Sequence, residues 1–245
     1  CALFDHRFAG QQRLKGQWAG SMEELGKITQ LIVHLGLFDL VFNLETILMT
    51  WIVIGALLTF GFLAARRRQT VPGPLQVIGE MLVAIFYGLA EDALGKKLAR
   101  TYAPLTCALF MFVLASNWLG ILPHLHEPTK DLNTPLSLGL MGFFIAHYAG
   151  IRAKGFKEYA RAYIDPMFFM LPLNLIGEIA KVVSVSFRLF GNIMGGSIII
   201  LVVSYLSFNL VLPPFLNAFF GLFVGTVQAF VFTMLTLVYI SVQVQ

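Results

Sequence analysis

Charge is scarce in this sequence. Only 12% of its 245 residues are charged and 58% are hydrophobic, whereas a soluble domain carries about 25% charged and about 45–50% apolar residues. A chain of this length cannot enclose so many apolar side chains in one core, because small proteins leave much of their surface in water. The composition therefore excludes a soluble enzyme, a nucleic-acid-binding domain and a disordered tail. It indicates an integral membrane protein.

Cysteine is nearly absent as well. The two cysteines, Cys1 and Cys107, have no metal-ligand spacing. Cys107 lies inside an apolar run, where a cysteine is typically a small buried hydrophobe. We therefore expect no metal site. The formal net charge of +4 does not indicate a nucleic-acid partner, because Lys and Arg cluster at the ends of apolar runs, which is typical of membrane orientation.

Long apolar runs predict the membrane helices. The first span, at about 46–66, matches the ~30 Å hydrocarbon core of a bilayer. Further crossings are predicted at about 104–122 and 135–151, followed by two over-long runs at 172–206 and 214–242. Such extra length implies a steep tilt or a curved path. The expected fold class is all-α, with about five membrane-embedded helices of which the last two form a long, steeply tilted hairpin.

The remaining segments are more polar. Residues 75–100 place apolar side chains at steps of three and four but also carry several charges, which predicts an amphipathic helix at the membrane surface. Residues 1–45 form an N-terminal segment that is polar and then partly apolar. Met22 is consistent with a natural start, so that 1–21 is a candidate extension. Residues 46–245 are expected to form a single membrane domain.

Clusters of basic residues predict the orientation of these helices. Arg66, Arg67 and Arg68 directly follow the first span. A second basic stretch, 152–161, follows the third span, whereas the loop before that span contains Lys130 as its only Lys or Arg. Such basic ends remain on the cytoplasmic side, or on the equivalent side in an organelle. We expect the N-terminus and the Lys130 loop on the opposite side.

One arginine lies inside the fourth apolar run. No Asp, Glu, Lys, Arg or His follows Arg188 up to Gln245. Placing arginine at mid-bilayer depth costs about 2.5–3.5 kcal/mol on insertion scales, and charges inside membranes generally mark function. The structural alternative is an arginine that snorkels to the headgroups or pairs with Glu178. Snorkelling is awkward this far inside a helix, and Glu178 is some 15 Å away along the axis, which excludes a direct intrahelical pair.

Small residues accompany Arg188 on its helix. At 100° per residue, Gly191, Asn192 and Gly195 lie on the face of Arg188. Together with Gly196, these glycines form a track like the small-xxx-small pattern that lets another helix approach closely. Ordinary helix packing is the simpler explanation of such a track. Combined with a central arginine, however, it predicts a partner helix close to a fixed positive charge.

The last apolar run contains a similar arrangement. Asn217, Gly221 and Gln228 share a face by steps of four and seven, and Gly221 and Gly225 have the small-residue spacing. Alone, a glutamine in a membrane helix indicates a modest hydrogen bond of about 0.6–2 kcal/mol between helices. Opposite Arg188 across a helical hairpin, Gln228 would orient the guanidinium or organise water.

The sequence around Arg188 is similar to a known signature. Ser-Phe-Arg188-Leu-Phe-Gly-Asn resembles the signature of subunit a of F-type ATP synthases, the static half of a proton rotor. Three other segments extend this resemblance over most of the chain: Ser-Asn117-Trp-Leu-Gly-Ile-Leu-Pro, Pro-Leu-Asn-Leu-Ile-Gly-Glu178 and Gln228-Ala-Phe-Val-Phe-Thr-Met-Leu-Thr.

The resemblance implies the partners and the location of the protein. It implies a non-catalytic, proton-translocating subunit without a cofactor, which is not an enzyme on its own. Its partners would be a c-ring, the subunit b peripheral stalk, the rest of the ATP synthase complex and the lipid bilayer, with no nucleic acid. The last two helices would lie against the c-ring. The membrane would be the bacterial inner membrane, or the inner or thylakoid membrane of an organelle.

The resemblance also implies roles for individual residues. Arg188 matches the essential arginine that faces the c-ring carboxylates, and Asn192 and Gln228 match two polar residues near it. Two offset aqueous half-channels would connect the ring to the two sides of the membrane. Arginine suits this role because its pKa is above about 12, so that it cannot carry protons itself. It also favours the anionic form of a nearby carboxylate.

This sequence departs from the family pattern at two positions. Ser197 stands nine residues after Arg188, where many members have an ionisable group, and Gly221 stands seven residues before Gln228, where some have His or Glu. The usual titratable pair of the outer half-channel is thus missing. Water with polar groups is expected to replace this pair, supplied with protons from the loop after the second span. These residues are Asn192, Ser197, Asn217 and Gln228, with Asp131, His124 or His126 in the loop.

Several alternatives remain open from the sequence. Glu178 either relays protons in the inner half-channel or forms an interfacial ion pair with Lys181 at i+3. His147 is more typical of a polar packing residue. A secondary transporter would use Arg188 to bind an anionic substrate, but it should contain internal repeats. A structural scaffold would not need a central arginine beside a glycine track. The coupling ion, H⁺ or Na⁺, depends on the site in the rotor.

Overall fold

The computed structural model describes residues 30–35, 38–66, 73–122, 125, 127–164, 170–206 and 212–244. The chain divides into two compact units, Cys1–Leu48 and Met49–Gln245. In the first unit, β1 (Gln30–Leu35) and β2 (Phe38–Asn43) form an antiparallel two-stranded sheet that pairs Gln30 with Asn43. The sequence pattern had not indicated these two strands.

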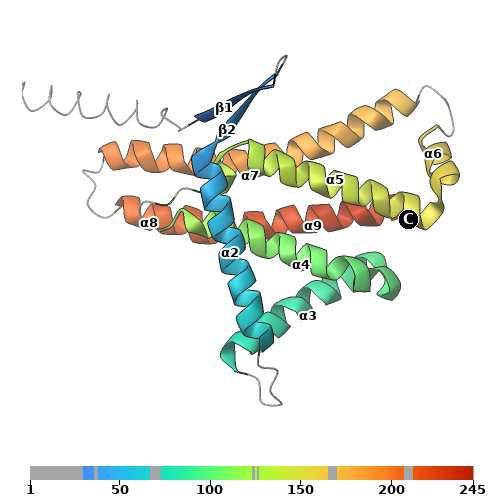
Figure 1. The fold of residues 1–245 in the computed structure, drawn as a ribbon, viewed down its shortest axis with the longest axis horizontal. Helices are drawn as coiled ribbons and strands as arrows, with labels where there is room; N and C mark the ends of the chain where they lie inside the picture. Colours follow the sequence, from blue (N-terminus) through green and yellow to red (C-terminus); the bar gives the residue numbers. More distant parts are fainter. Residues whose placement is uncertain are drawn as a thin grey trace, which may run out of the picture. The chain divides into compact units, whose positions relative to one another are not determined.

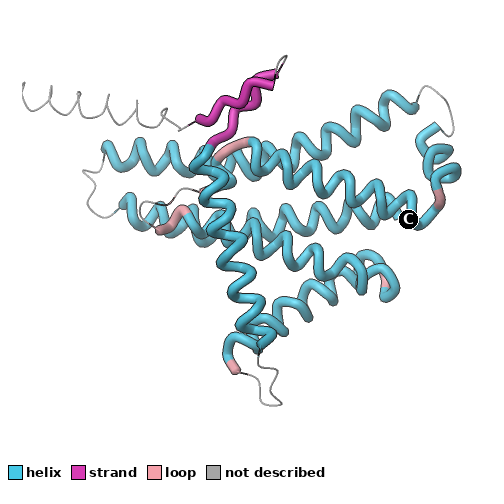
Figure 2. Tube along the Cα trace, in the orientation of Figure 1, coloured by secondary structure: helices cyan, strands magenta, loops and turns pink. Residues whose placement is uncertain are grey.

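Five helical segments are long and apolar enough to cross a membrane, as predicted. They are α2 (Leu44–Arg66), α4 (Lys96–Leu119), α5 (Asn133–Lys154), most of α7 (Met170–Leu206), and the stretch Leu212–Val244. The last stretch consists of α8 (Leu212–Ala218), a π-helical segment η2 (Phe219–Val224) and α9 (Gly225–Val244). Helices make up nearly all of the described part of the second unit (Figure 2). The chain is therefore a multi-pass membrane protein.

A glycine divides the helix that was expected over 75–100. The structure has α3 at Pro74–Leu94, with proline at its first position, where a missing N–H costs nothing. Gly95 has a φ of 78° and donates its backbone N–H to the carbonyl oxygen of Glu91 at 2.8 Å. This positive φ favours glycine and ends the helix. Residues 96–100 consequently begin α4, which correspondingly starts before the expected residue 104.

Two short elements connect the later helices. The 3₁₀ turn η1 (Pro128–Lys130) lies between α4 and α5, and the amphipathic helix α6 (Phe156–Ile164) follows Gly155 after α5. Gly155 has a φ of 86°, so the chain turns there as it does at Gly95. These turns allow the chain to reverse between long helices.

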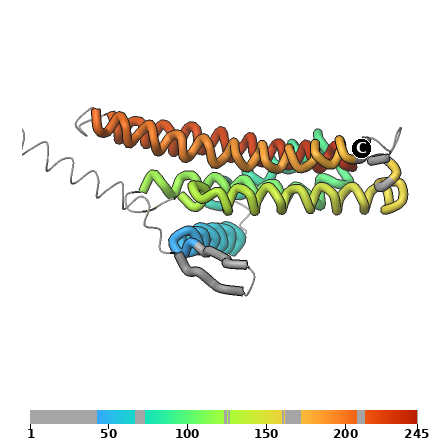
Figure 3. Tube along the Cα trace, turned by 90° about the horizontal axis from the view of Figure 1, so that it is seen from above, coloured from blue at the N-terminus to red at the C-terminus, as the bar shows by residue number. Residues whose placement is uncertain are grey.

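Four helices pack side by side in the second unit. Figure 1 shows α4, α5, α7 and α9 running alongside one another, and Figure 3 shows α7 and α9 in one layer with α4 and α5 in the next. Their core is apolar and includes the fully buried side chains of Val113, Leu189 and Phe232. Large apolar side chains also cover the outer surface, for example Trp51 and Phe62 on α2. Lipid is the appropriate solvent for such a surface.

Candidate functional site

A polar cavity lies between the C-terminal half of α7 and the segment that leads into α9. Its volume is about 50 Å³, and we name it the Asn192 cavity. This volume is enough for water, since one water needs about 10–15 Å³ by the same kind of measure. Six polar side chains line the cavity: Asn117, Glu127, Asn192, Ser197, Asn217 and Gln228. The structure therefore brings together all four polar residues that were expected to replace the missing titratable pair.

A hydrogen bond joins the two long helices across this cavity. Asn192 Nδ2 donates to Gln228 Oε1 at 2.7 Å. Gln228 is only 5% exposed, and its Nε2 is buried without a hydrogen-bond partner within the part of the chain that the structure describes. A buried amide N–H without a partner is costly, and such groups are commonly satisfied by water. Gln228 thus presents an unused donor beside a cavity of water size.

Close packing of α4 against η2 and α9 forms one wall of the cavity. Asn117 Nδ2 donates to the carbonyl oxygen of Gly225 at 2.9 Å. A Cβ added at Gly221 would approach Ile121 Cγ1 to 2.5 Å, and one at Gly196 would approach Phe220 Cδ1 to 3.1 Å. Gly196, Gly221 and Gly225 had been expected to pack against a partner helix. In the described chain they allow close contacts between its own helices, and packing against a partner helix stays a prediction.

Arg188 lies on a different surface of α7. Its side chain is exposed, and within the described ranges no hydrogen bond or ion pair involves its guanidinium. A Cβ added at Gly191 or Gly195 would meet nothing within 4 Å. The face that carries Arg188 is therefore smooth and open. Glu178 is not its partner.

A second polar cavity, of about 20 Å³, lies at the other end of the same helix pair. We name it the Glu178 cavity. It is lined by residues from the N-terminal half of α7, the C-terminal half of α9 and α5, among them His147, Glu178, Lys181 and Gln243. It thus places a carboxylate, an ammonium group, an imidazole and an amide around one small volume.

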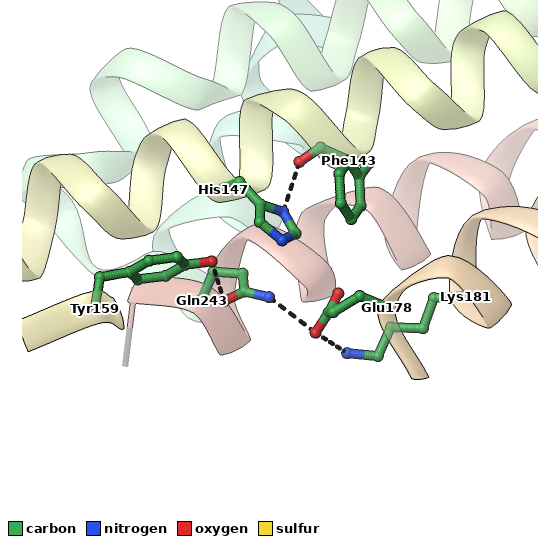
Figure 4. A network of polar contacts seen from close by, with 6 residues as sticks. All are labelled: Phe143, His147, Tyr159, Glu178, Lys181 and Gln243. Atoms are coloured by element: carbon green, nitrogen blue, oxygen red, sulfur yellow. Dashed lines mark hydrogen bonds and ion pairs between the residues drawn. The ribbon is translucent and has the colours of Figure 1, made fainter. Parts of the chain in front are cut away.

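Hydrogen bonds connect Glu178 directly to α9 and, through Gln243, to α6 (Figure 4). Lys181 Nζ lies 2.7 Å from Glu178 Oε1, and Gln243 Nε2 donates to the same oxygen at 3.0 Å. Tyr159 of α6 donates its hydroxyl proton to Gln243 Oε1 at 2.8 Å. The ion pair between Glu178 and Lys181 is therefore present, and the same carboxylate also lines the cavity. Sequence reasoning identified neither Tyr159 nor Gln243.

His147 packs beside this network. Its Nδ1 is 3.0 Å from the carbonyl oxygen of Phe143. Its ring centroid is 3.9 Å from that of Phe143 and 6.1 Å from that of Tyr159. These contacts are those of a polar packing residue, although the imidazole also lines the Glu178 cavity.

Apolar side chains separate the two cavities. On α7, Leu189 lies between Val185, which lines the Glu178 cavity, and Asn192. On α9, Phe232 lies midway between Gln228 and Thr236, which are about 12 Å apart along the axis. Leu189 and Phe232 are both 0% exposed and belong to one cluster. We name the pair Leu189 and Phe232, with the core around it, the apolar barrier.

The other candidates lie elsewhere or could not be placed. Asp131 Oδ1 accepts the backbone N–H of Asn133 at 3.1 Å, at the start of α5, and does not line either cavity. His124 and His126 lie outside the described residues. The described ranges contain no group of three His, Cys, Asp or Glu side chains that could hold a metal ion. Glu127, which does line the Asn192 cavity, was missed because its neighbours in the loop offered more familiar proton carriers.

Comparisons with known proteins complete the description. A family described as ATP synthase A chain matches residues 47–241. The chain is 38% identical to ATP synthase subunit a of Moorella thermoacetica, over 86% of this chain and 94% of that protein. It is 36% identical to ATP synthase subunit a 2 of a Bradyrhizobium strain, over 87% and 93%. It is 37% identical to ATP synthase subunit a of Helicobacter acinonychis, over 78% and 86%.

Proposed function

This chain belongs to the ATP synthase A chain family, and we propose that it provides two offset half-channels and the fixed charge that couples proton flow to rotation. Family membership places it in the membrane sector of an ATP synthase, with roles in ATP synthesis and proton transport. Its five apolar helices and its bacterial relatives agree with a multi-pass protein of the bacterial inner membrane. The proposal names the residues that carry out this role.

The position of Arg188 is the observation that carries the proposal. Its guanidinium is exposed and lacks a partner within the described chain. Along α7, Val185 lies three residues before Arg188 and lines the Glu178 cavity. Asn192 lies four residues after Arg188 and lines the Asn192 cavity. An unpaired charge in a lipid-facing helix is costly, so a partner with a complementary carboxylate would stabilise it. The carboxylates of a c-ring satisfy this requirement.

The cavities take the places of the two half-channels. The positive-inside rule puts the loop before α5 on the non-cytoplasmic side and the basic end of α5 on the cytoplasmic side. The Asn192 cavity includes Glu127 of that loop, whereas the Glu178 cavity connects to Tyr159 of α6, just beyond the basic end. The Asn192 cavity is thus assigned to the outer half-channel and the Glu178 cavity to the inner one.

The positive charge of Arg188 determines where the rotor carboxyl releases its proton. A rotor carboxylate that reaches Arg188 is favoured as the anion, so it releases its proton to one half-channel and is reprotonated from the other after it passes. Arg188 keeps its own proton and repels hydronium between the cavities. The membrane potential supplies about 2.3 kcal/mol per charge per 100 mV. The apolar barrier closes the direct route through the protein.

The open glycine face supports a close approach of the rotor. Gly191 and Gly195 leave space beside Arg188, and small residues are typical where membrane helices pack closely. At 37 residues, α7 is about 55 Å long, well beyond the ~30 Å core. We infer that α7 and the stretch Leu212–Val244 lie steeply tilted along the c-ring. The remaining assigned partners are the subunit b stalk and the rest of the complex.

Removal of the charge tests the proposal. Arg188→Ala should abolish ATP-driven proton pumping and gradient-driven ATP synthesis in membrane vesicles, while the complex stays assembled. Arg188→Lys should fail nearly as badly, because lysine lacks the planar fork and can lose its proton when buried. The matched control is Arg100→Ala, which removes an exposed arginine of α4 outside both cavities. Substantial coupled synthesis by Arg188→Ala would refute the proposal.

Orientation is tested by labelling. Single cysteines that replace Lys130 and Arg152 should react with a membrane-impermeant thiol reagent from opposite sides, with Arg152→Cys accessible from the cytoplasm. Cys1 and Cys107 are replaced by serine in both variants so that this chain carries a single thiol. Labelling of both positions from the same side would overturn the assignment of the two cavities.

A further inference from the structure

The Asn192 cavity has a single titratable side chain among its described lining residues. That residue is Glu127, which belongs to the loop before η1. The described segments of α4, α7, α8, η2 and α9 contribute only amide, hydroxyl, glycine and apolar groups to the cavity. Ser197 and Gly221 occupy the two helix positions at which this sequence departs from the family pattern. A loop carboxyl therefore lies where the helices provide none.

The loop is held in place by buried contacts. Thr129 and Pro128 are buried, and Thr129 Oγ1 donates to Asn117 Oδ1 at 2.9 Å. The carbonyl oxygen of Glu127 accepts the backbone N–H of Lys130 at 3.0 Å. Since Asn117 is itself bonded to Gly225 of α9, this chain of contacts ties the loop to the wall of the cavity. Glu127 is thus positioned by the fold.

The carboxyl group of Glu127 depends on a glycine. A Cβ added at Gly120 would overlap Oε1, Cδ and Cγ of Glu127. Any side chain at position 120 would therefore displace the carboxyl group from its present place. Gly120 has a φ of −69°, which every residue can adopt, so the requirement for glycine at this position is one of space.

The described residues leave the side chain of Glu127 free to contact water in the cavity. Within the described chain, no hydrogen bond or ion pair involves the side chain of Glu127. Lys130 and Asp131 are the charged residues of the adjoining turn, and neither lines the cavity. The unpartnered Nε2 of Gln228 belongs to the same cavity. Water in a space of about 50 Å³ can form hydrogen bonds with both the Glu127 carboxyl and Gln228 Nε2.

We propose that Glu127 is the proton-exchanging carboxyl of the outer half-channel, replacing the helix-borne groups that this chain lacks; this rests on the proposed function. Hydronium on the outer side transfers a proton to the Glu127 carboxylate and becomes water. The protonated carboxyl gives that proton to cavity water, and the water transfers it to an anionic carboxylate of the c-ring. Glu127 is regenerated, and no other reactant is consumed.

The test uses the assembled ATP synthase in inverted membrane vesicles, where the outer side of the membrane faces the lumen. ATP synthesis is measured while luminal pH is varied. With Glu127 intact, the rate should rise as the lumen is acidified and then level off. Glu127→Gln should lower the rate about a hundredfold or more, the range of a lost general acid–base, and should remove this plateau. The matched control is Glu80→Gln on α3, an exposed glutamate outside the cavity, which should change neither.

A second pair of variants tests position and charge separately. Gly120→Ala should reproduce the loss because the methyl group occupies the place of the carboxyl. Ser197→Asp added to Glu127→Gln should restore the plateau, since it returns a carboxyl to the same cavity. If Glu127→Gln does not assemble, Glu127→Asp takes its place and should shift the midpoint of the pH profile. An assembled variant with an unchanged pH profile would overturn the proposal, whatever its rate.

Arg188→Ala, measured in parallel, separates two kinds of failure. Loss of coupling in Arg188→Ala together with normal synthesis and a normal plateau in Glu127→Gln would refute only the role of Glu127. Retained coupling in Arg188→Ala would refute the half-channel function itself, and the role of Glu127 with it.

Discussion

The two cavities lie on the same pair of helices but differ in how their polar groups are bonded. In the Glu178 cavity, the carboxylate has a fixed ion pair with Lys181 and a hydrogen bond from Gln243. In the Asn192 cavity, amides and hydroxyls predominate, Gln228 keeps an unused donor, and the carboxyl of Glu127 has no partner within the described chain. One cavity holds its charge by direct contacts, whereas the other leaves room for water. The same pair of helices therefore holds polar groups in two different ways.

The largest expected effect comes from joining the two cavities. Phe232→Ser would replace the largest side chain of the apolar barrier with a small polar one, which allows water to connect the cavities because polar voids hydrate and apolar ones stay dry. We expect a rapid passive decay of an imposed pH gradient and a loss of net ATP synthesis. Proton leak is followed with a pH-sensitive dye in vesicles without ATP.

A matched variant on the same helix controls this experiment. Phe230→Ser removes a phenylalanine that is 43% exposed, away from the barrier. It should leave the gradient intact. Equal leak rates for the two variants would contradict the view that Phe232 separates the cavities.

The next effect separates the two interpretations of Glu178. Glu178→Gln alone should reduce proton pumping strongly, because it removes a carboxyl and also leaves the half-exposed ammonium group of Lys181 without its ion-pair partner. In the double variant Glu178→Gln with Lys181→Gln, the unpaired charge is gone. Pumping that stays low in the double variant indicates a proton relay, whereas recovery to near wild-type pumping indicates an ion pair alone. The amount of assembled complex is measured in each case.

A smaller effect is expected from the link between Gln243 and α6. Tyr159→Phe removes the 2.8 Å hydrogen bond to Gln243, so it should lower thermal stability by about 0.5–1.5 kcal/mol and reduce pumping slightly. Tyr87→Phe, which alters an exposed tyrosine, is the control. An unchanged melting temperature in Tyr159→Phe would mean that this end of the network contributes nothing.

The smallest effect is expected at Ser197. Its hydroxyl donates to the carbonyl oxygen of Ile193 at 3.0 Å within α7 and carries no charge. Ser197→Ala should therefore change ATP synthesis far less than Glu127→Gln, although both residues line the Asn192 cavity. A loss as large as that of Glu127→Gln would show that the hydroxyls are essential to this cavity.

Hydropathy and charge predicted the membrane helices because those signals are local in sequence. The runs at 46–66 and 135–151 correspond to α2 and α5 within a few residues. The shared faces of the last two helices similarly led to Asn192 and Gln228, which the structure joins by a hydrogen bond. The helical period and the local composition are sufficient to predict such features.

The features that were missed depend on contacts between distant residues. A single glycine is tolerated inside many helices, so the sequence alone did not reveal that Gly95 would take a positive φ. The place of Glu127 is set by the bond between Thr129 and Asn117 and by the absence of a side chain at Gly120. Gln243 is an uncharged residue near the C-terminus and gave no signal until Glu178 was found beside it.

The π-helical segment η2 (Phe219–Val224) sets the rotational phase between the two ends of the last span. Each residue of an α-helix corresponds to a rotation of about 100°, and a π-helical turn accommodates its residues with a wider i→i+5 spacing. The amides of Asn217 and Gln228 lie on either side of this turn yet line the same cavity. Deleting one residue from η2 would rotate α9 by about 100° about its axis relative to α8. Gln228 would then point away from Asn192 even though the amino acids that line the cavity were unchanged.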